Sequence, residues 1–522
     1  MELFIIRHGE SIGNNKRGFM SGKSDLDGLS EKGKIQAIRL AWELRKVKFD
    51  RIISSPVTRA RETANIVGFA NSASVTTDVA FSELDHGIFE GHFWWEEEVV
   101  NKIPKNWREN HREDWTTPYP EGESIKDMCE RVWNGLQELI QTISTHEKVA
   151  VVAHQAVIAA ISYWAKQGRA KTSGREVLDY IHTKHYPNAS AFSISKKAGK
   201  YKIQNTLDKF TSVNSSVDSV RFYTNHIFHK KVEDITNVST VSSNNVYQLD
   251  GESSAVIKIL SDQESLTASR LIRLYSYLEK NSTISAPKIL HQDLSGCFFG
   301  HDVIIQDYAN GKDQSACIKS KHSSKQLLQD IYTNITKLHQ LPLEQVQDFW
   351  YPDDWEEKAH PNWKLYMQTE INHTITSLYK TNLPMKSLAY TLRNLSKLEE
   401  YINSDKYALV PLHGDLVPKN IIVDHNGDCE FIRLVDFERA RIGDALWDLV
   451  YYYGHLQRLD LKLQDAWQDC FWGSLSKERK EIFELFLTLF HAWSVRDMEE
   501  YKDDTKRGNL GCKSLNILKQ LV

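Results

Sequence analysis

Short apolar segments, each followed by an amphipathic stretch, recur through the first two hundred residues and constrain the fold more than any other feature. Leu3–Ile6, Arg51–Ser54 and Val149–Ala153 have the length and composition of buried strands, and a helical pattern follows each one. This alternation predicts βαβ units, and therefore an α/β domain with a doubly wound, mostly parallel sheet. Ala191–Ser195 and Tyr201–Leu207 predict a final pair of strands.

The periodicity is lost over residues 208–225, which are polar and Ser-rich. A chain of 522 residues is too long for one hydrophobic core, so at least two domains are expected. We therefore predict a first domain over 1–210, a linker over 211–225 and a second domain over 226–522.

The second domain begins with strand-like segments and becomes mainly helical toward residue 522. The candidate elements are strands at Asn245–Leu249, Ala255–Leu260 and Val303–Asp307, a helix at Leu266–Glu279, and the interruption Leu409–Asp436. This pattern differs from that of the first domain and predicts a separate core.

Charge and composition exclude several functional classes. The net charge of -4 argues against a broad nucleic-acid surface, which requires clustered Lys and Arg. We predict no membrane partner, because no apolar run is long enough to span a bilayer, and the N-terminus lacks the basic segment of a signal peptide. No oligomer is indicated. The six cysteines are far apart without a Cys-x-x-Cys pair, so we expect neither a zinc site nor a disulfide framework and predict a cytoplasmic protein.

Polar residues follow the strand candidates at the sheet edge where ligands bind in open α/β folds. Arg7, His8, Gly9 and Glu10 come directly after the first strand. The later members of the set are Asn14, the run Ser54-Ser55-Pro56-x-x-Arg59-Ala60, Glu83, Glu90-Gly91 and His154. In this order the set resembles the histidine phosphatase superfamily, also called phosphoglycerate-mutase-like, over about residues 1–205. Taken alone, His154 would be read as a structural histidine and Arg59 as a surface ion-pair residue.

The chemistry of phosphate esters explains these residue types. A neutral imidazole can attack phosphorus and form a phosphohistidine, while guanidinium groups bind phosphoryl oxygens bidentately. The resemblance implies that His8 is the nucleophile, and that Glu83 protonates the leaving oxygen and then activates water. The residues that it places around the phosphate are Arg7, Asn14, Arg59 and His154. No cofactor or metal is expected in this domain.

Three points in this domain remain open. Asp85 and Glu90 lie close to Glu83 and compete with it for the acid role. The family usually has glycine after its second histidine, whereas this chain has Gln155, which would narrow the pocket or add a hydrogen-bonding group. The segment 83–91 favours a phosphatase over a mutase. The Trp-rich segment 93–120 either caps the site or is ordinary helical packing.

A second set of polar residues lies between Leu409 and Asp436. Protein kinases use His-Arg-Asp-x-x-x-x-Asn followed by Asp-Phe-Gly. Here His413-Gly-Asp415 precedes Asn420 at the same spacing, and Asp436-Phe-Glu follows. The His-Gly-Asp form resembles the aminoglycoside phosphotransferase and choline kinase superfamily from about residue 230 to the C-terminus. The resemblance implies an α+β bilobal protein-kinase-like fold, with an N-lobe over about 226–310 and a helical C-lobe over about 311–522.

The resemblance also implies roles for individual residues. Asp415 would accept the proton of a substrate hydroxyl, and Asn420 and Asp436 would hold Mg²⁺ on the phosphates of ATP. Lys258 would contact the α- and β-phosphates. Further expectations are a hinge at Val303–Tyr308 that meets adenine, and structural roles for Asp444 and Asp448.

The second domain departs from the kinase pattern at two places. The segment 242–247, where a phosphate-covering loop is expected, contains no glycine. No helix glutamate is suitably placed to pair with Lys258, because Glu264 is too close in sequence and Glu279 too far along.

The leading hypothesis is a bifunctional enzyme. One half would hydrolyse a small phosphomonoester, and the other would transfer the γ-phosphate of ATP to the hydroxyl of a sugar, polyol or amino alcohol. Successive steps of an activated-sugar or surface-glycan pathway would explain the pairing. The alternative is a phosphatase regulated by a non-catalytic, ligand-binding kinase-like domain. Action of both halves on proteins ranks third.

Overall fold

The computed structural model describes residues 2–520, with gaps. The residues outside this description are 1, 26, 169–172, 198–199, 208–211, 230, 239–244, 251–253, 261–264, 282–283, 321–324, 351–362, 382, 425–428, 460, 501–504 and 521–522. The chain divides into two compact units: Met1–Asn237 with Asp293–Val303, and Val238–Gln292 with Ile304–Val522. Among the described residues, no helix has the length and apolar composition that a membrane crossing requires.

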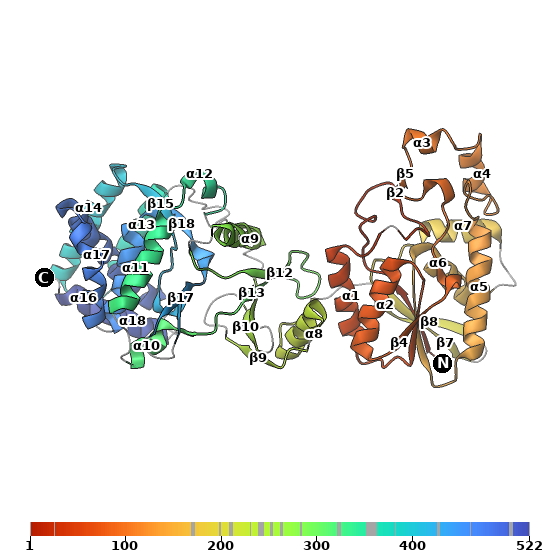
Figure 1. Cartoon of the computed structure of the whole chain (residues 1–522), viewed down its shortest axis with the longest axis horizontal. Coiled ribbons are helices and arrows are strands. Elements are labelled where there is room, and N and C mark those ends of the chain that lie inside the picture. The colour runs from red at the N-terminus through yellow and green to blue at the C-terminus, as the bar shows by residue number, and fades with distance from the viewer. Residues whose placement is uncertain are drawn as a thin grey trace. The chain divides into compact units, whose positions relative to one another are not determined.

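The N-terminal unit contains a six-stranded sheet in the order β4-β3-β6-β1-β7-β8 (Figure 1). Its strands are β1 (Glu2–Arg7), β3 (Arg51–Ser54), β4 (Ser74–Thr77), β6 (Lys148–Ala153), β7 (Ala191–Lys197) and β8 (Lys200–Leu207). β4, β3, β6 and β1 are parallel, whereas β7 pairs antiparallel with both β1 and β8. The sheet is therefore mixed, with a parallel centre and an antiparallel edge.

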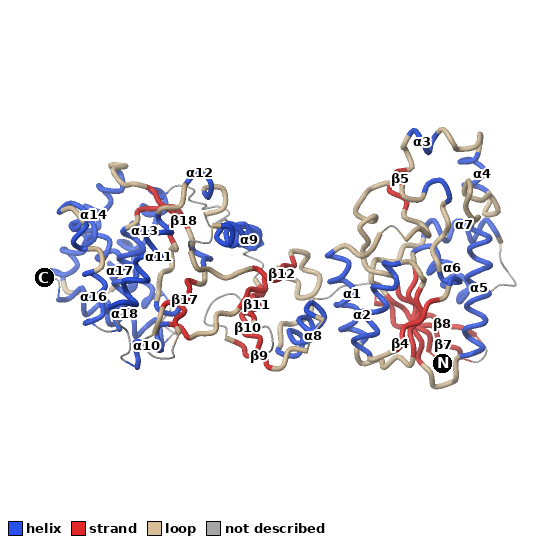
Figure 2. The backbone as a smooth tube through the Cα atoms, in the orientation of Figure 1, coloured by secondary structure: helices blue, strands red, loops and turns tan. Residues whose placement is uncertain are grey.

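Helices cover both faces of this sheet (Figure 2). They are α1 (Glu31–Leu44), α2 (Thr58–Asn71), α5 (Ile125–Thr142), α6 (Gln155–Gln167) and α7 (Gly174–Thr183). Successive side chains of a strand point to opposite faces. Leu3 and Ile5 accordingly pack with α5, α6 and α7, whereas Phe4 and Ile6 pack with α1 and α2. Burial on both faces explains why β1 is a continuous apolar run.

The segment between β4 and α5 carries short elements. They are η1 (Val79–Phe81), η2 (Gly87–Phe89), β5 (His92–Phe93), α3 (Glu97–Val100) and α4 (Trp107–Glu113), and β5 pairs with β2 (Phe19–Met20). Trp107 stacks on Phe89 and His111. Trp94 and Trp95 are instead 45% and 50% exposed. The predicted cap segment thus contains both packed and exposed tryptophans, and its capping role stays a prediction.

The predicted linker at 211–225 contains most of a helix, α8 (Val217–Phe228), which precedes β9 (Asp234–Asn237). Ser216 caps α8, because its hydroxyl accepts from the backbone N–H of Ser219. Phe222 packs against the α1/α2 face of the N-terminal unit. The segment predicted as a linker therefore contains most of a helix, whose polar side obscured its periodicity in the sequence.

The second unit begins with a sheet in which β12, β13, β11 and β10 are neighbours in that order. Their bounds are β10 (Asn245–Asp250), β11 (Ala255–Ile259), β12 (Ile289–Asp293) and β13 (Val303–Asp307), and α9 (Ser265–Lys280) follows β11. β10 and β11 are antiparallel, with Val246 opposite Lys258. The strand and helix positions predicted for this part are confirmed to within a few residues.

The rest of the second unit is largely helical. Its helices are α10 (Gln314–Ser320), α11 (Lys325–His339), α12 (Leu343–Val346), α13 (Trp363–Leu378), α14 (Met385–Asn403), α15 (Leu446–Leu459), α16 (Leu461–Asp469), η6 (Trp472–Ser474), α17 (Lys477–Glu500) and α18 (Thr505–Gln520). The interruption consists of β15 (Leu409–Leu412), η4 (Pro418–Asn420), β16 (Ile421–Val423), β17 (Phe431–Leu434), η5 (Phe437–Arg439) and β18 (Arg441–Asp444). β14 (Lys312–Asp313) pairs with β16, and β15 with β18.

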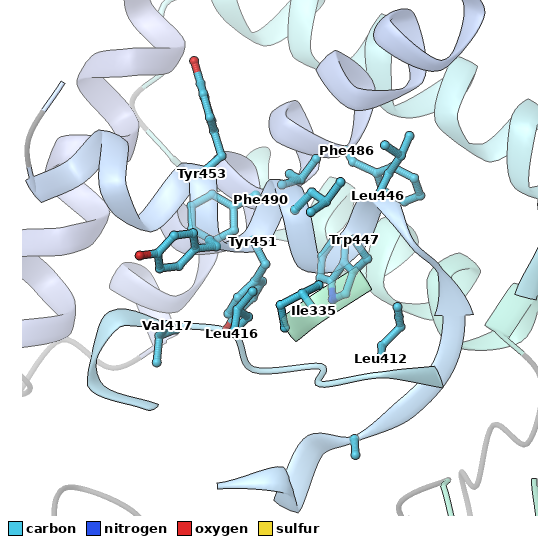
Figure 3. Packing of buried hydrophobic residues seen from close by; sticks show 14 of the residues in the cluster. Ile335, Leu412, Leu416, Val417, Leu446, Trp447, Tyr451, Tyr453, Phe486 and Phe490 are labelled. Carbon is cyan, nitrogen blue, oxygen red and sulfur yellow. The ribbon is translucent and has the colours of Figure 1, made fainter. Parts of the chain in front are cut away.

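A large apolar cluster supports the segment between β15 and β16. Leu412 and Leu416 are fully buried in it, together with Trp447 of α15 (Figure 3). The indole N–H of Trp350, which is also fully buried, donates to the carbonyl of Leu412 at 2.9 Å. These contacts fix the end of β15, from which the polar loop begins.

One expectation about the cysteines is wrong. Cys429 is disulfide-bonded, whereas the sequence spacing gave no sign of a disulfide. The cysteines described as free are Cys129, Cys297, Cys470 and Cys512. Sequence spacing detects only local cysteine pairs, so a bond between cysteines far apart in the chain leaves no such signature.

Close backbone approach between β1 and α1 requires glycine at Gly9 and Gly33. A Cβ at Gly33 would lie 1.9 Å from the carbonyl oxygen of Glu10, and one at Gly9 would lie 2.3 Å from that of Gly33. We predict that Gly33→Ala destabilises the N-terminal unit by about 1–3 kcal/mol, because α1 must move away from the strand end. Thermal unfolding measures this. Gly473→Ala, which would meet nothing within 4 Å, is the control. Equal midpoints for the two variants would contradict the prediction.

Candidate active sites

His8 follows β1 directly and is 3% exposed. Its Nδ1 lies 2.6 Å from the carbonyl oxygen of Gly9. A carbonyl can only accept, so this contact assigns the proton to Nδ1 and leaves the lone pair on Nε2. Burial, followed by the charges of Arg59 and Arg7, lowers the pKa of His8 well below its ordinary value. The ring is therefore neutral at neutral pH, with a lone pair on Nε2.

Two buried guanidinium groups lie beside His8. Arg59 makes an ion pair with Asp27 at 2.8 Å and also donates to the carbonyl of Gly22. Arg7 donates to the carbonyl of Tyr186, and its buried Nε has no hydrogen-bond partner in the described part of the chain. Burial lowers the pKa of Arg7 to about 10, against the opposing charge of Glu83. Arg7 thus stays cationic at neutral pH, and an anion would satisfy its unpaired N–H.

His154 caps the arrangement from the end of β6. Its Nε2 lies 2.8 Å from the hydroxyl of Ser55, and its ring centroid lies 5.0 Å from that of His8. Its buried Nδ1 has no partner among the described residues. Burial, with the charge of Arg59 next, lowers the pKa of His154 well below its ordinary value. Ser55 is a site residue that sequence reasoning missed, although it lies within the Ser-Ser-Pro motif.

Asn14 lies at the exposed rim. Its Oδ1 accepts from the backbone N–H of Ser11 at 3.1 Å and from the side-chain amide of Asn188 at 3.3 Å. Both contacts use the oxygen of the Asn14 amide, which leaves its nitrogen available to donate to a ligand. Asn188 also donates to the carbonyl of His8 at 3.2 Å. Asn188 was not predicted, because nothing in the local sequence marks it.

The geometry distinguishes Glu83 from the two neighbouring carboxylates. Glu83 is 9% exposed, and burial raises its pKa even though Arg59 and Arg7 act in the opposite direction. Asp85 instead accepts from the backbone of Gly87. Glu90 accepts from the backbone N–H groups of His86 and Lys23. Only Glu83 of these three combines a raised pKa with the influence of both site arginines, which suits a general acid.

The side chain of Gln155 makes hydrogen bonds to a neighbouring backbone segment and not to the pocket. Its Nε2 donates to the carbonyl of Lys184 at 2.6 Å, and its Oε1 accepts from the N–H of Tyr186 at 3.0 Å. The carbonyl of Tyr186 in turn accepts from Arg7. The residue that replaces the usual glycine therefore positions the backbone segment that holds Arg7.

The second site lies at the end of β15. Asn420 donates from Nδ2 to Asp415 Oδ2 at 3.1 Å and to the Asp415 carbonyl at 2.9 Å, which leaves its Oδ1 facing away from Asp415. The hydroxyl of Tyr451 donates to Asp415 Oδ1 at 3.2 Å. His413 bonds the carbonyl of Val435, the residue before Asp436, at 3.0 Å. The structure thus brings Asp415, Asn420 and Asp436 together. Sequence reasoning missed Tyr451, because it lies on α15, far along the chain from Asp415.

The glycine in His-Gly-Asp has a steric cause. Gly414 has φ of +78°, and a Cβ there would lie 2.0 Å from the carbonyl oxygen of Arg439. Asp448 is fully buried and accepts from the backbone N–H groups of His413 at 2.8 Å and Gly414 at 3.0 Å. Burial alone would raise the pKa of Asp448, but the hydrogen bond from His339 and other donors lower it. Asp448 therefore fixes the loop as an anion, as its expected structural role requires.

Lys258 points from β11 to two carboxylates. Its Nζ lies 2.8 Å from Asp436 and 2.7 Å from Glu438. Burial would lower the pKa of Lys258, but these two charges raise it well above its ordinary value. Lys258 in turn holds the pKa of Asp436 at about 2, against the opposing effect of burial. Glu438 is thus a second carboxylate partner of Lys258, which the sequence reasoning did not anticipate.

The structure tests some of the places where the second domain departs from the kinase pattern. Glu279 forms an ion pair with Lys288 at 3.4 Å, so it does not serve Lys258. Glu264 and residues 242–244 of the expected phosphate-covering loop lie outside the described residues. In the expected hinge, the N–H of Asp307 donates to the carbonyl of Lys288, and that of Tyr308 to Ser254. Asp444 accepts from Arg479 and Tyr401, as a structural residue would.

One unit holds a buried neutral histidine beside two arginines, and the other holds a kinase-like Asp-Asn-Asp set. Together they define a phosphoryl-transfer protein with two different domains. Residues 3–192 match the histidine phosphatase superfamily (branch 1), and residues 234–475 match the phosphotransferase enzyme family. The chain belongs to the histidine phosphatase superfamily through its first domain and carries a phosphotransferase-family domain after it.

Similar proteins are known for the first domain. Phosphoserine phosphatase 1 of Hydrogenobacter thermophilus is 35% identical over 154 residues, which are 30% of this chain and 71% of that protein. The 2,3-bisphosphoglycerate-dependent phosphoglycerate mutase of Thermoplasma acidophilum is 30% identical over 224 residues, 42% of this chain and 96% of that protein. A solved mycobacterial glucosyl-3-phosphoglycerate phosphatase is 26% identical and covers 40% of this chain and 98% of its own, with a TM-score of 0.33.

The raised pKa of Glu83 gives a pH prediction. A general acid must be protonated, so a raised pKa extends hydrolysis to higher pH, and the rate falls as pH rises through it. We predict that Glu83→Gln lowers kcat about 10²- to 10⁴-fold and removes this descending limb. The pH profile of kcat measures both effects. Asp85→Asn, the control, should keep the limb, and an unchanged profile in Glu83→Gln would assign the acid elsewhere.

The Gln155 contacts give a second prediction. Gln155→Ala removes both hydrogen bonds to the segment that holds Arg7. At about 1 kcal/mol each, their loss should raise KM for the phosphomonoester about 5- to 30-fold, with a smaller effect on kcat. Steady-state hydrolysis measures this. Gln167→Ala, at the exposed end of the same helix, should change neither constant, and equal KM values in the two variants would rule out the positioning role.

Proposed function

We propose that the chain is a bifunctional enzyme. Its first domain hydrolyses a small phosphomonoester through a phosphohistidine on His8, and its second transfers the γ-phosphate of ATP to a hydroxyl of a small molecule. The observation that carries the first proposal is the neutral His8 ring, protonated on Nδ1, beside Arg7 and Arg59. The observation that carries the second is the pair of hydrogen bonds that place Asn420 and Tyr451 on opposite oxygens of Asp415.

Hydrolysis would proceed in two steps. Nε2 of His8 attacks phosphorus, and the bond to the ester oxygen breaks while Glu83 gives that oxygen its proton. Glu83, now a carboxylate, takes a proton from water, and the hydroxide attacks phosphohistidine to release inorganic phosphate. Arg7 and Arg59 stabilise the charge on the phosphoryl oxygens throughout.

Hydrolysis is preferred to mutase chemistry within the first domain. The relatives include a phosphoserine phosphatase and a phosphoglycerate mutase, so their names alone are compatible with both. Both names do describe small phosphate esters, which supports a small phosphomonoester as substrate. Glu83 has a raised pKa in a site where His8 and His154 are neutral. A carboxyl group whose pKa is raised, beside a neutral imidazole, suits the general acid and the nucleophile of a phosphatase.

In the second domain, Asp415 accepts the proton of the attacking hydroxyl, and hydrogen bonds from Tyr451 and Asn420 hold the Asp415 carboxylate in orientation. The free Oδ1 of Asn420 and the carboxylate of Asp436 are hard oxygen donors that suit Mg²⁺. When bound there, the metal would neutralise charge on the phosphates of ATP. The described residues include no group of three or more His, Cys, Asp or Glu that could hold a metal. Mg²⁺ does not need one, because phosphates and water complete its shell.

One observation favours the regulatory alternative. Lys258 is bound to both Asp436 and Glu438, so a lysine expected to meet phosphates already has two anionic partners. In a working kinase, nucleotide phosphates must displace at least one of them. A domain that binds nucleotide without turnover would keep both contacts.

Turnover by each half separates these possibilities. We predict that Asp415→Asn lowers acceptor-dependent ADP formation about 10²- to 10⁴-fold, because the hydroxyl loses its base, while phosphomonoester hydrolysis is unchanged. His8→Ala should have the opposite pattern. Asp405→Asn, an exposed carboxylate, is the control for charge. ADP formation that survives Asp415→Asn would exclude the proposed base, and its absence from the wild type with every acceptor would support the regulatory alternative.

A further inference from the structure

Three arginines gather around one tyrosine beside Asp415. The guanidinium carbon of Arg441 lies 4.0 Å from the ring centroid of Tyr366 on α13. Arg439 and Arg496 also act electrostatically on Tyr366. Arg439 and Arg441 flank the end of η5 and the start of β18, directly after the Asp436 segment. This group is called the arginine cluster below, and it consists of Arg439, Arg441 and Arg496.

The cluster lies on the acceptor side of Asp415. Oδ2 of Asp415 accepts from Asn420, which is proposed to bind the metal and nucleotide, whereas Oδ1 accepts from Tyr451. Protein atoms that desolvate Arg439 would lower its pKa, but Asp415, Tyr451 and Tyr366 raise it. The carbonyl of Arg439 packs against Gly414, the residue before Asp415, and Arg441 lies opposite Leu412 in the β15–β18 pair, so both arginines adjoin the loop that carries Asp415. A hydroxyl that gives its proton to Asp415 would come from a molecule in contact with this side.

The three arginines differ in how closely a carboxylate approaches them. Arg496 forms a buried ion pair with Glu370 at 2.9 Å. Asp415 acts electrostatically on Arg439, but in the part of the chain that the structure describes neither Arg439 nor Arg441 has a carboxylate within ion-pair distance. The Nε of Arg441 donates to the carbonyl of Arg439 at 3.2 Å, and its guanidinium lies over the ring of Tyr366. Among the described residues the terminal nitrogens of Arg441 make no hydrogen bond, so they can donate to a ligand.

We propose that the acceptor of the second domain is an alcohol that carries an anionic group, a phosphate or a carboxylate, held by Arg439 and Arg441. This inference rests on the proposed kinase function. Planar guanidinium groups bind both anions bidentately, and a guanidinium stacked on Tyr366 is preorganised for that contact. An amino alcohol would place a further cation against Arg439 and Arg441, so this class of acceptor is disfavoured.

The reaction balances with this acceptor. Its hydroxyl oxygen bonds to the γ-phosphorus of ATP, the bond from that phosphorus to the β,γ-bridging oxygen breaks, and Asp415 takes the hydroxyl proton. ADP leaves with the bridging oxygen. The acceptor's own anionic group takes no part in bond changes and only fixes the position of the hydroxyl.

Matched acceptors provide the test. The His8→Ala chain removes hydrolysis by the first domain, and ADP release is measured with ATP and Mg²⁺. The acceptors are glucose, glucose 6-phosphate and glucuronate, and glycerol, glycerol 3-phosphate and glycerate, with ethanolamine and choline as cations. We expect ADP formation with at least one anionic alcohol and none above background with its neutral partner or the cations. The phosphate and carboxylate members show which anion is preferred.

Variants then connect the preference to the cluster. Arg439→Gln and Arg441→Gln should each raise KM for the anionic acceptor about 10- to 100-fold and leave KM for ATP unchanged, which also shows that the domain is folded. Arg441→Lys should retain part of the affinity. Arg393→Gln, an exposed arginine on α14, is the control.

The outcomes separate the inference from the function beneath it. Turnover of a neutral sugar or an amino alcohol at the rate of its anionic counterpart would overturn the inference and leave the kinase standing. So would an unchanged acceptor KM in both glutamine variants. No ADP formation with any acceptor would overturn the proposed kinase, and the inference with it.

Discussion

Two arginine side chains buried beside two neutral imidazoles are the constraint on which the N-terminal unit depends. Burying a guanidinium costs several kcal/mol unless it is paired and hydrogen-bonded. Asp27 pairs with Arg59, whereas Arg7 relies on the carbonyl of Tyr186 and the nearby charge of Glu83. The site is thus short of negative charge until a phosphate enters. Burial, together with the charges of Arg59 and Arg7, keeps the His8 ring neutral, as the proposed nucleophile must be.

Charge is arranged differently in the second unit, because Asp448 and Asp436 already have hydrogen-bond or ion-pair partners within the protein. Asp448 accepts hydrogen bonds from two backbone N–H groups and contacts His339, and Asp436 is paired with Lys258. By contrast, neither Arg439 nor Arg441 has a carboxylate within ion-pair distance among the described residues. In the proposed reactions, cations of each unit would meet an anionic substrate.

Much of this arrangement could be predicted from the sequence, and the remainder has a common physical cause. β1, β3 and β6 were predictable because both-face burial makes apolar runs, and Arg7, His8 and Asp415 because they lie in contiguous motifs. The roles of Gln155, Glu438 and Tyr451 depend on side-chain reach between segments far apart in the chain. Helix α8 was missed because capping by Ser216, rather than an apolar period, marks its start.

The central claim is that His8 of this chain carries a phosphoryl group during turnover. Alkaline quenching during hydrolysis of a ³²P-labelled phosphomonoester, without ATP, measures this directly. The account predicts an acid-labile, alkali-stable label on the peptide that contains His8, present in the wild type and in Asp415→Asn and absent from His8→Ala. A turning-over wild type without this label, or a label that persists in His8→Ala, would contradict it.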